Sequence, residues 1–148
     1  MRAVVQRVSR ACVTTSDGLA GQIGRGLLVL VGVASGDDTA DIEYIASKIR
    51  ELRVFPDENG KMNRSLAEAN GQLLVVSQFT LMGDVRRGRR PAFDSAAPPD
   101  RARATFEALL DRLRTGGPVE TGVFQAHMDV DLNNDGPVTV LLDSRRAF

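Results

Sequence analysis

The sequence contains one cysteine, Cys12, and one histidine, His127, among its 148 residues. A single cysteine excludes an internal disulfide, and so few soft side chains argue against a zinc site. A cysteine–histidine nucleophile pair would have to use these two residues. Cys12 lies in a predicted strand, where a small buried thiol is the common case, and His127 stands beside Met128 in another predicted strand. We therefore interpret both as structural or surface residues and expect no cofactor.

Long hydrophobic runs are also absent. The longest, residues 27–34, is interrupted by Gly32 and falls far short of the roughly 20 apolar residues that span a bilayer. Residues 1–7 have the pattern of a strand and lack the apolar core of a signal peptide. The length fits one domain, residues 1–148, and contents of 43% hydrophobic and 26% charged residues are ordinary for a globular protein. We expect a cytoplasmic protein that does not bind a membrane.

An excess of either charge is missing as well, because the formal net charge at pH 7 is zero. The molecule as a whole would not attract nucleic acid, and DNA is not expected as a partner. Arginine nevertheless provides 17 of the 19 basic residues, and four arginines surround Gly88, at Arg86, Arg87, Arg89 and Arg90. The planar guanidinium suits phosphate oxygens. This run fits a solvated loop and a contact with a phosphate-bearing ligand equally well.

Alternating and continuous apolar patterns predict a domain rich in β-sheet. Residues 27–33 are apolar on both faces, which is typical of a central strand. Predicted strands cover residues 1–8, 10–15, 19–23, 27–33, 53–55, 73–81, 123–133 and 138–142, whereas residues 61–66 are predicted to be irregular. Asp129 and Asp131 share one face of a predicted strand. Because no third ligand is near, a solvated sheet face is a better interpretation than a metal site.

Two segments have helical spacing. The first begins at an N-cap in residues 37–39 and repeats apolar residues at Ile42, Ile45, Ile49 and Leu52. The second begins at residues 98–100 and ends at residues 116–117; its apolar face consists of Ala102, Phe106, Leu109, Leu110 and Leu113. Two helices and many strands predict the α+β class: a single compact domain with a mostly antiparallel, barrel-like sheet and two packed helices.

The segment Ser77-Gln78-Phe79-Thr80-Leu81 follows the apolar run at residues 73–76. A buried strand that ends in a hydroxyl, an amide, an aromatic ring and a second hydroxyl has polar groups where more valine would fit. A functional site is expected at such a place. From these five residues alone, hydroxyls that bond the neighbouring backbone are the simpler interpretation.

A second unusual segment is Asn134-Asp135-Gly136-Pro137. Asn-Asp-Gly between two strands is typical of a tight hairpin. Pro137 complicates this interpretation, because proline cannot donate to a ladder and restricts the residue before it. A cis Gly-Pro bond would direct the two flanking carbonyls to nearly the same side, as an acceptor pair for an ammonium group. Alone, a Gly-Pro turn is structural far more often than functional.

The two segments together resemble the paired signatures of the D-aminoacyl-tRNA deacylases. The resemblance rests on residues 77–81, 88–93 and 134–139, and extends to residues 1–8 and 60–63. It covers nearly the whole chain, and two separated motifs in the right order make it specific. Cys12 differs from the small residues frequent at its position, and Arg87 from a common lysine. Residues 145–148 run past the usual end, and we expect a frayed tail there.

The resemblance implies a deacylase-like fold and a homodimer that hydrolyses the ester joining a D-amino acid to the 3′ end of tRNA. Gly136 and Pro137 of the partner subunit would reach into the active site, face the substrate's ammonium with their carbonyls, and exclude L-amino acids. The implied site residues fall into three groups: catalytic Ser77, Gln78, Thr80 and the backbone of Phe79; substrate-binding Gly136, Pro137, Arg7 and Met128; and tRNA-binding Arg86, Arg87, Arg89 and Arg90. Arg7 would hold the Gly-Pro segment in place.

The chemistry expected of this site is modest. An aminoacyl ester is already activated, so orienting its carbonyl, stabilising the oxyanion with backbone N–H groups and admitting a water are sufficient. Thr80 is the obvious nucleophile, but an internal threonine lacks the α-amine that activates N-terminal threonine hydrolases. The resemblance implies assistance by the ribose 2′-hydroxyl of the tRNA, with Thr80 shaping the pocket. Because a rigid wall excludes only side chains, we also expect activity on glycyl-tRNA.

Two other functions are open at this point. A nucleic-acid-binding module without enzymatic activity would use the arginine segment, residues 86–90, but would leave Gly136–Pro137 unexplained. The third possibility is a Thr80-dependent hydrolase of another ester.

Overall fold

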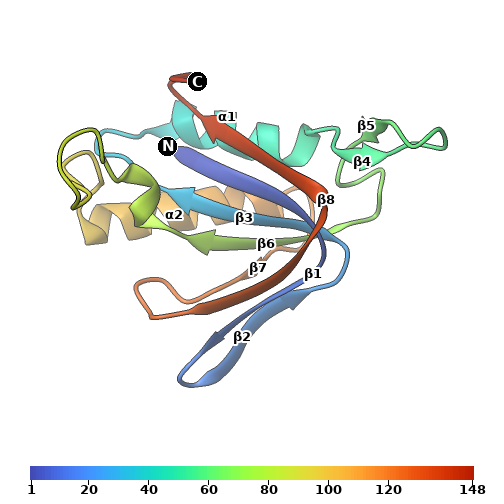
Figure 1. The fold of residues 1–148 in the computed structure, drawn as a ribbon, viewed down its shortest axis with the longest axis horizontal. Helices are drawn as coiled ribbons and strands as arrows, with labels where there is room; N and C mark the ends of the chain where they lie inside the picture. The colour runs from blue at the N-terminus through green and yellow to red at the C-terminus, as the bar shows by residue number, and fades with distance from the viewer.

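The long strand β1 (Arg2–Thr15) organises the fold of the computed structural model, which describes residues 1–148 (Figure 1). It pairs antiparallel with three strands: β2 (Gly18–Ile23), β3 (Gly26–Gly32) and β8 (Asp129–Asp143). The sheet continues from β3 to β6 (Gln72–Ser77) and β7 (Glu120–Thr121) through parallel pairs. One long strand therefore joins the two ends of the chain in a single six-stranded sheet.

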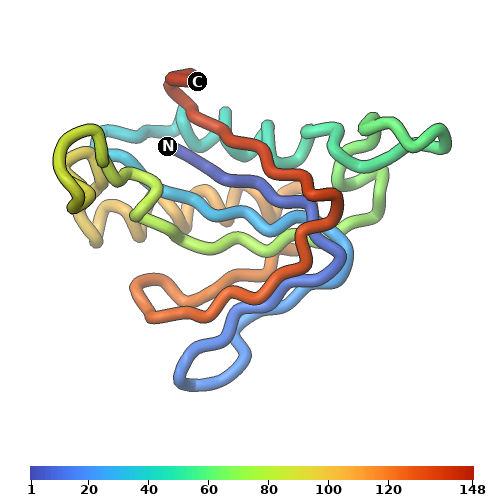
Figure 2. The backbone as a smooth tube through the Cα atoms, in the orientation of Figure 1, coloured from blue at the N-terminus to red at the C-terminus, as the bar shows by residue number.

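The sheet curls because the two halves of β1 have different neighbours. Residues 2–8 pair with β3, whereas residues 11–15 pair with β2. The tube in Figure 2 shows β1 and β8 following the same curve. The curled end encloses a small core cluster that includes Val8, Val13, Leu74 and Val76. These observations confirm the predicted α+β domain with a barrel-like sheet.

Helices α1 (Thr39–Glu51) and α2 (Pro99–Arg114) pack on the other face of the sheet (Figure 1). The Asp38 side chain caps α1 by accepting from the Ala40 N–H at 2.8 Å. Ile45 and Ile49 of α1 and Leu109 of α2 are fully buried in the main core cluster of 21 residues. Both predicted helices are confirmed. Neither is long and apolar enough to cross a membrane.

The segment after α1 differs from the prediction. Short strand β4 (Phe55–Pro56) pairs with β5 (Met62–Arg64), where irregular structure was predicted. The Asp57 carboxylate closes the hairpin by accepting from the backbone N–H groups of Asn59 and Lys61 at 2.8 and 3.0 Å. The prediction for residues 61–66 was therefore wrong at its centre, because a side-chain acceptor sets this turn.

The predicted strand at residues 73–81 is too long. Strand β6 ends at Ser77, and a short 3-10 helix, η1 (Phe79–Met82), follows it. The Gln78 N–H makes the last bond to β3, with the Val31 carbonyl at 2.7 Å, and the Gln78 carbonyl then accepts from Leu81 at 3.2 Å. The chain turns at Gln78 because this residue is shared between sheet and helix.

The predicted break in the last strand was also wrong. Residues on both sides of Gly136 belong to β8 and pair with β1, so no hairpin forms. The extra residues bulge from one continuous strand, and the Gly136–Pro137 peptide bond is cis. His127 lies in the irregular segment between the turn at residues 124–125 and β8, and is not in a strand as predicted.

The two termini lie side by side (Figure 1). The α-ammonium of Met1 is buried and donates to Asp37 Oδ1 at 2.7 Å and to Ser144 Oγ at 2.8 Å. Arg145 contacts the same region by donating to the Ser35 carbonyl at 3.1 Å. Fraying of residues 145–148 stays a prediction.

Candidate functional site

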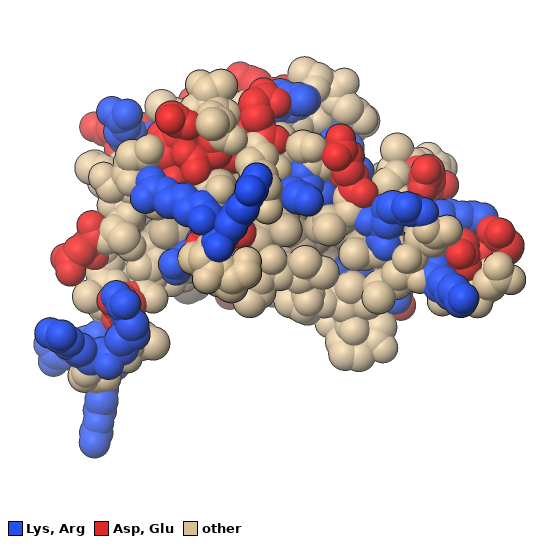
Figure 3. Space-filling model, turned by 90° about the horizontal axis from the view of Figure 1, so that it is seen from above, with Lys and Arg blue, Asp and Glu red and all other residues tan.

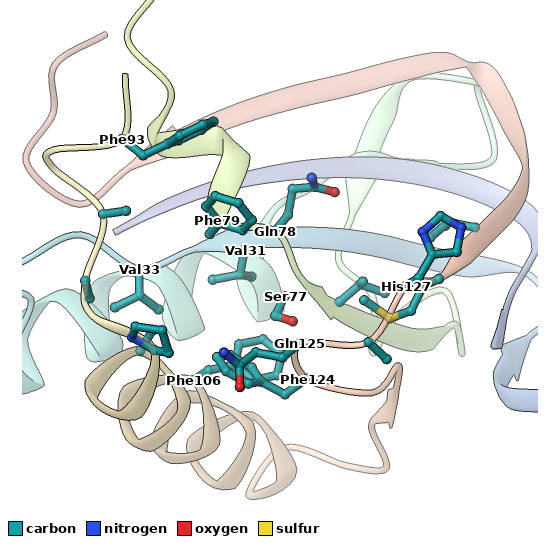
Figure 4. Close-up of a pocket in the computed structure, with 18 residues that line it drawn as sticks. Val31, Val33, Ser77, Gln78, Phe79, Phe93, Phe106, Phe124, Gln125 and His127 are labelled. Atoms are coloured by element: carbon teal, nitrogen blue, oxygen red, sulfur yellow. The ribbon is translucent and has the colours of Figure 1, made fainter. Parts of the chain in front are cut away.

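A cavity of about 660 Å³ lies where the ends of β3 and β6 meet α2 and the segment before β8 (Figure 4). Most of its lining is apolar. The lining residues are Val31, Val33, Val76, Ser77, Gln78, Phe79, Phe93, Ala96, Ala97, Pro99, Ala102, Phe106, Phe124, Gln125, Ala126, His127, Met128 and Val130. An apolar cavity with a few polar groups is the usual form of a small-ligand site.

The predicted segment at residues 77–80 reaches this cavity only in part. Ser77, Gln78 and Phe79 line it, whereas Thr80 is exposed and outside the lining. The Gln78 amide donates to the Thr80 hydroxyl, which is thereby held beside the cavity. The structure therefore places three of the four predicted residues in the cavity lining and the threonine just outside it.

The backbone N–H groups at the start of η1 are not used by the hydrogen bonds of that helix. The first hydrogen bond of this turn runs from Leu81 to Gln78, so the N–H groups of Phe79 and Thr80 precede it. Gly32 permits the close approach of η1 to β3, because a Cβ on Gly32 would lie 2.9 Å from the Gln78 carbonyl oxygen. The Phe79 ring packs against Phe93 with centroids 5.0 Å apart. Backbone donors and an aromatic pair thus form one end of the cavity.

Most of the opposite wall was not predicted as part of a site. The centroid of the Phe124 ring lies 6.0 Å from that of Phe106 and 4.6 Å from the Arg103 guanidinium carbon. Phe106 was assigned to the apolar face of the second helix, and helical spacing does not distinguish core from cavity lining. Met128, predicted to bind substrate, is in this wall, where its sulfur accepts from the Val123 N–H at 3.4 Å. Ser77 points towards Phe124 and Gln125 across the cavity (Figure 4).

His127 lies at the rim, and its side chain is 95% exposed. Its nearest acidic partner is Asp129, with 4.0 Å between Nε2 and Oδ1. This distance is too long for the hydrogen bond that would orient a general base. No group of three or more His, Cys, Asp or Glu side chains is arranged to hold a metal ion.

A second group of predicted residues lies on β1 and β8, outside the cavity lining. The side chain of Arg7 donates from Nε to the Asp135 carbonyl at 3.1 Å and from Nη1 to the Val54 carbonyl at 2.6 Å. Its guanidinium is also paired with the Asp135 carboxylate at 3.2 Å. Gly136 and Pro137 are exposed beside this contact. Within one chain, the two signature segments therefore form separate parts of the surface.

The arginine loop, residues 86–90, is fully solvent-facing. Lys and Arg side chains gather and protrude at the same end of the molecule in Figure 3. Backbone bonds between Asp84 and Ala92, at 2.7 and 2.9 Å, close the base of the loop. The Arg86 side chain, followed by its backbone N–H, donates to the Asp84 carboxylate and lowers the pKa of Asp84 to about 2.

Known proteins resemble this chain over its full length. A family model described as D-Tyr-tRNA(Tyr) deacylase matches residues 4–143. A D-aminoacyl-tRNA deacylase of Symbiobacterium thermophilum is 59% identical over 149 residues, which cover 100% of this chain and 99% of that protein. Another from Kosmotoga olearia is 56% identical over 148 residues and is covered completely, as is this chain.

Solved structures give the same result for the fold. A protein described as c-Myc DNA Unwinding Element Binding Protein superposes with a TM-score of 0.92 at 41% identity, covering 97% of this chain and 98% of that one. A probable eukaryotic D-amino acid tRNA deacylase, 19% identical, has a TM-score of 0.79 over 95% of this chain and 97% of its own. The second likeness concerns the fold alone. The family match and the full-length relatives show that this chain belongs to the D-aminoacyl-tRNA deacylases, a family of hydrolases.

Proposed function

We propose that the chain hydrolyses the ester between a D-amino acid and the 3′ end of tRNA, and that the cavity at Ser77–Phe79 receives the aminoacyl end. The observation that carries the proposal is that Ser77, Gln78 and Phe79, which resemble the family signature, line a mostly apolar cavity of about 660 Å³. The cavity is large enough for an amino acid and part of a nucleoside. Family membership supports the reaction class.

Hydrolysis in this cavity relies on orientation and on backbone donors. The N–H of Phe79, which precedes the first turn of η1, is the proposed donor to the developing oxyanion. No Ser-His-Asp arrangement is available, because His127 is exposed and 4.0 Å from Asp129. The attacking water is therefore assisted by the 2′-hydroxyl of the terminal ribose, and Thr80 shapes the edge of the pocket through its bond to Gln78.

Selection against L-amino acids requires a wall that the chain alone does not supply, since its own Gly136 and Pro137 are outside the cavity lining. We assign this wall to Gly136 and Pro137 of the partner subunit. Main-chain atoms make a stiff wall, which would clash with an L side chain and leave a D side chain free. Such a wall excludes side chains only, so glycyl-tRNA should also be hydrolysed.

An apolar patch of one exposed and two half-buried side chains supports the dimer. Leu141 on β8, Val4 on β1 and Leu30 on β3 lie in one row across the sheet, through the pairs Val4–Leu141 and Val4–Leu30. Leu141 is 57% exposed. The row lies between the Gly136–Pro137 segment of β8 and the Ser77 end of β6. A two-fold axis through it would exchange these two regions, because an isologous interface applies the same patch on both subunits.

A deacylation assay with matched D-, L- and glycyl-tRNA substrates tests the proposal. Hydrolysis of the D-aminoacyl and glycyl esters with little hydrolysis of the L-ester is expected. Tight tRNA binding without hydrolysis would instead indicate a nucleic-acid-binding module. Equal hydrolysis of D- and L-esters would contradict selection by exclusion, and inertness towards the glycyl ester would contradict the main-chain wall.

A further inference from the structure

A bulge interrupts the pairing of β8 with β1 at the proposed chiral wall. The two strands pair regularly from Arg2–Asp143 to Gln6–Thr139, and pairing resumes at Val8–Asn134. Arg7 alone on β1 therefore faces residues 135–138 on β8. We call these four residues the Gly-Pro bulge. A segment this long needs anchors at its two ends, because its own backbone lacks the regular ladder bonds.

The side chain of Asn134 provides one of these anchors. Its amide nitrogen Nδ2 donates to the Arg7 carbonyl at 3.0 Å and to the Val138 carbonyl at 2.9 Å. One amide group thereby uses both of its N–H donors. It connects the start of the bulge to the residue that closes it and to the facing strand. Asn134 is half-buried, so water competes only partly for these carbonyls.

Arg7, on the facing strand β1, provides the other anchor by binding Asp135. Its guanidinium binds the Asp135 carbonyl and carboxylate, while its own backbone carbonyl is held by Asn134. The tip between these anchors has little free space. A Cβ on Gly136 would lie 2.7 Å from Val138 Cγ2 and 2.8 Å from the Val138 nitrogen. Only Pro137 separates Val138 from Gly136 in the chain, so a shift of Val138 would also displace Gly136.

We propose that Asn134 is the positioning residue that fixes the Gly-Pro bulge for discrimination between D- and L-aminoacyl esters. The inference rests on the proposed function, in which the bulge of one subunit forms the wall of the other subunit's site. Asn134 touches no substrate and acts through Val138 and Gly136. A wall must hold its position to exclude a side chain, so a loosened bulge admits L-esters.

The substitution Asn134→Asp isolates this role. It keeps the size of the side chain but replaces two N–H donors by a carboxylate oxygen, which repels the Arg7 and Val138 carbonyls. Asn133→Asp is the matched control, since Asn133 is the exposed neighbour on the same strand. Asn134→Ala, which removes the donors without adding charge, is the second variant if Asn134→Asp fails to fold.

The readout is the ratio of kcat/KM for a D-ester to that for the matched L-ester, with melting temperature measured in parallel. Both Asn134 variants should lower this ratio at least tenfold, chiefly by raising hydrolysis of the L-ester, whereas Asn133→Asp should leave it unchanged. Faster hydrogen exchange at Val138 should accompany the loss. A lower melting temperature with an unchanged ratio would show a merely structural role and overturn the inference.

Gly136→Ala separates this inference from the proposed function. If Gly136→Ala lowers the ratio and neither Asn134 variant does, the bulge is the wall but Asn134 does not position it. If Gly136→Ala also leaves the ratio unchanged, the wall lies elsewhere and the proposed function itself is wrong on this point.

Discussion

Arg86 forms a bidentate ion pair with Asp84: Nη2 donates to Oδ2 at 2.6 Å, and Nε donates to Oδ1 at 2.9 Å. The first arginine of the loop is therefore already neutralised by its own chain. Arg87, Arg89 and Arg90 have no acidic partner among the salt bridges of the structure. These three are better placed to release counterions from RNA.

Arg87→Ala should weaken tRNA binding and reduce the slope of log affinity against log salt by about 0.7 to 0.9, the value for one lost phosphate contact. Arg86→Ala should reduce this slope less, because its charge is compensated by Asp84. Arg114→Ala, at the end of α2, is the control. Measurements of tRNA affinity at several salt concentrations give the slope for each variant. Equal slopes for the Arg86 and Arg87 variants would contradict the prediction.

Formation of the Arg86–Asp84 ion pair should depend on pH. Because Arg86 lowers the pKa of Asp84 to about 2, the ion pair is fully formed above the ordinary pKa of 3.8 and is lost as the pH falls through about 2. Titration followed by NMR should give a midpoint near 2 for Asp84. Arg86→Ala should raise it towards 3.8. A wild-type midpoint near 3.8 would show that the pair does not form in solution.

Thr80→Ala should retain deacylation within about tenfold, because the threonine hydroxyl is outside the cavity lining and bonded to Gln78. Single-turnover rates with a D-aminoacyl-tRNA measure this directly. A loss of several orders of magnitude, as expected for a missing nucleophile, would restore Thr80 as a catalytic residue.

Leu141→Arg should convert the proposed dimer into monomers and abolish D-selective deacylation, since a charge would enter the apolar patch. Leu19→Arg is a close control, because Leu19 is 56% exposed and Leu141 is 57% exposed. Light scattering coupled to size-exclusion chromatography gives the mass. If the two variants have the same mass and activity as the wild type, the interface lies elsewhere.

Asp37→Asn should lower the free energy of unfolding by about 3 kcal/mol, because it removes the nearest charged partner of the buried Met1 ammonium and leaves only Asp41, at 3.9 Å. Asp38→Asn should cost well under about 1 kcal/mol, since asparagine caps helices as well as aspartate does. Urea denaturation of both variants measures the difference. Equal losses would mean that the buried pair adds nothing beyond an ordinary cap.

Helix α1 shows what the sequence predicts well: Ile45 and Ile49 follow helical spacing and are buried as expected. The end of β6 was harder to predict, because Phe79 and Leu81 are compatible with a strand as well as with a 3-10 helix. Phe106 and Phe124 have ordinary core patterns, and only the folded chain places them around a cavity. The segment at Asn134 has the residues of a hairpin, and local sequence cannot indicate that both its flanks pair with β1.

The bulge also affects how β8 behaves as the edge of a sheet. β8 has one partner, β1, and its other side is unpaired over 15 residues. A flat, regular edge of this length is a template for strand addition and aggregation. Pro137 cannot donate to a new neighbour, and Asp129 and Asp131 bring charge to the edge. The Gly-Pro bulge that we connect with substrate choice therefore also interrupts the longest edge strand of the sheet, which disfavours strand addition there.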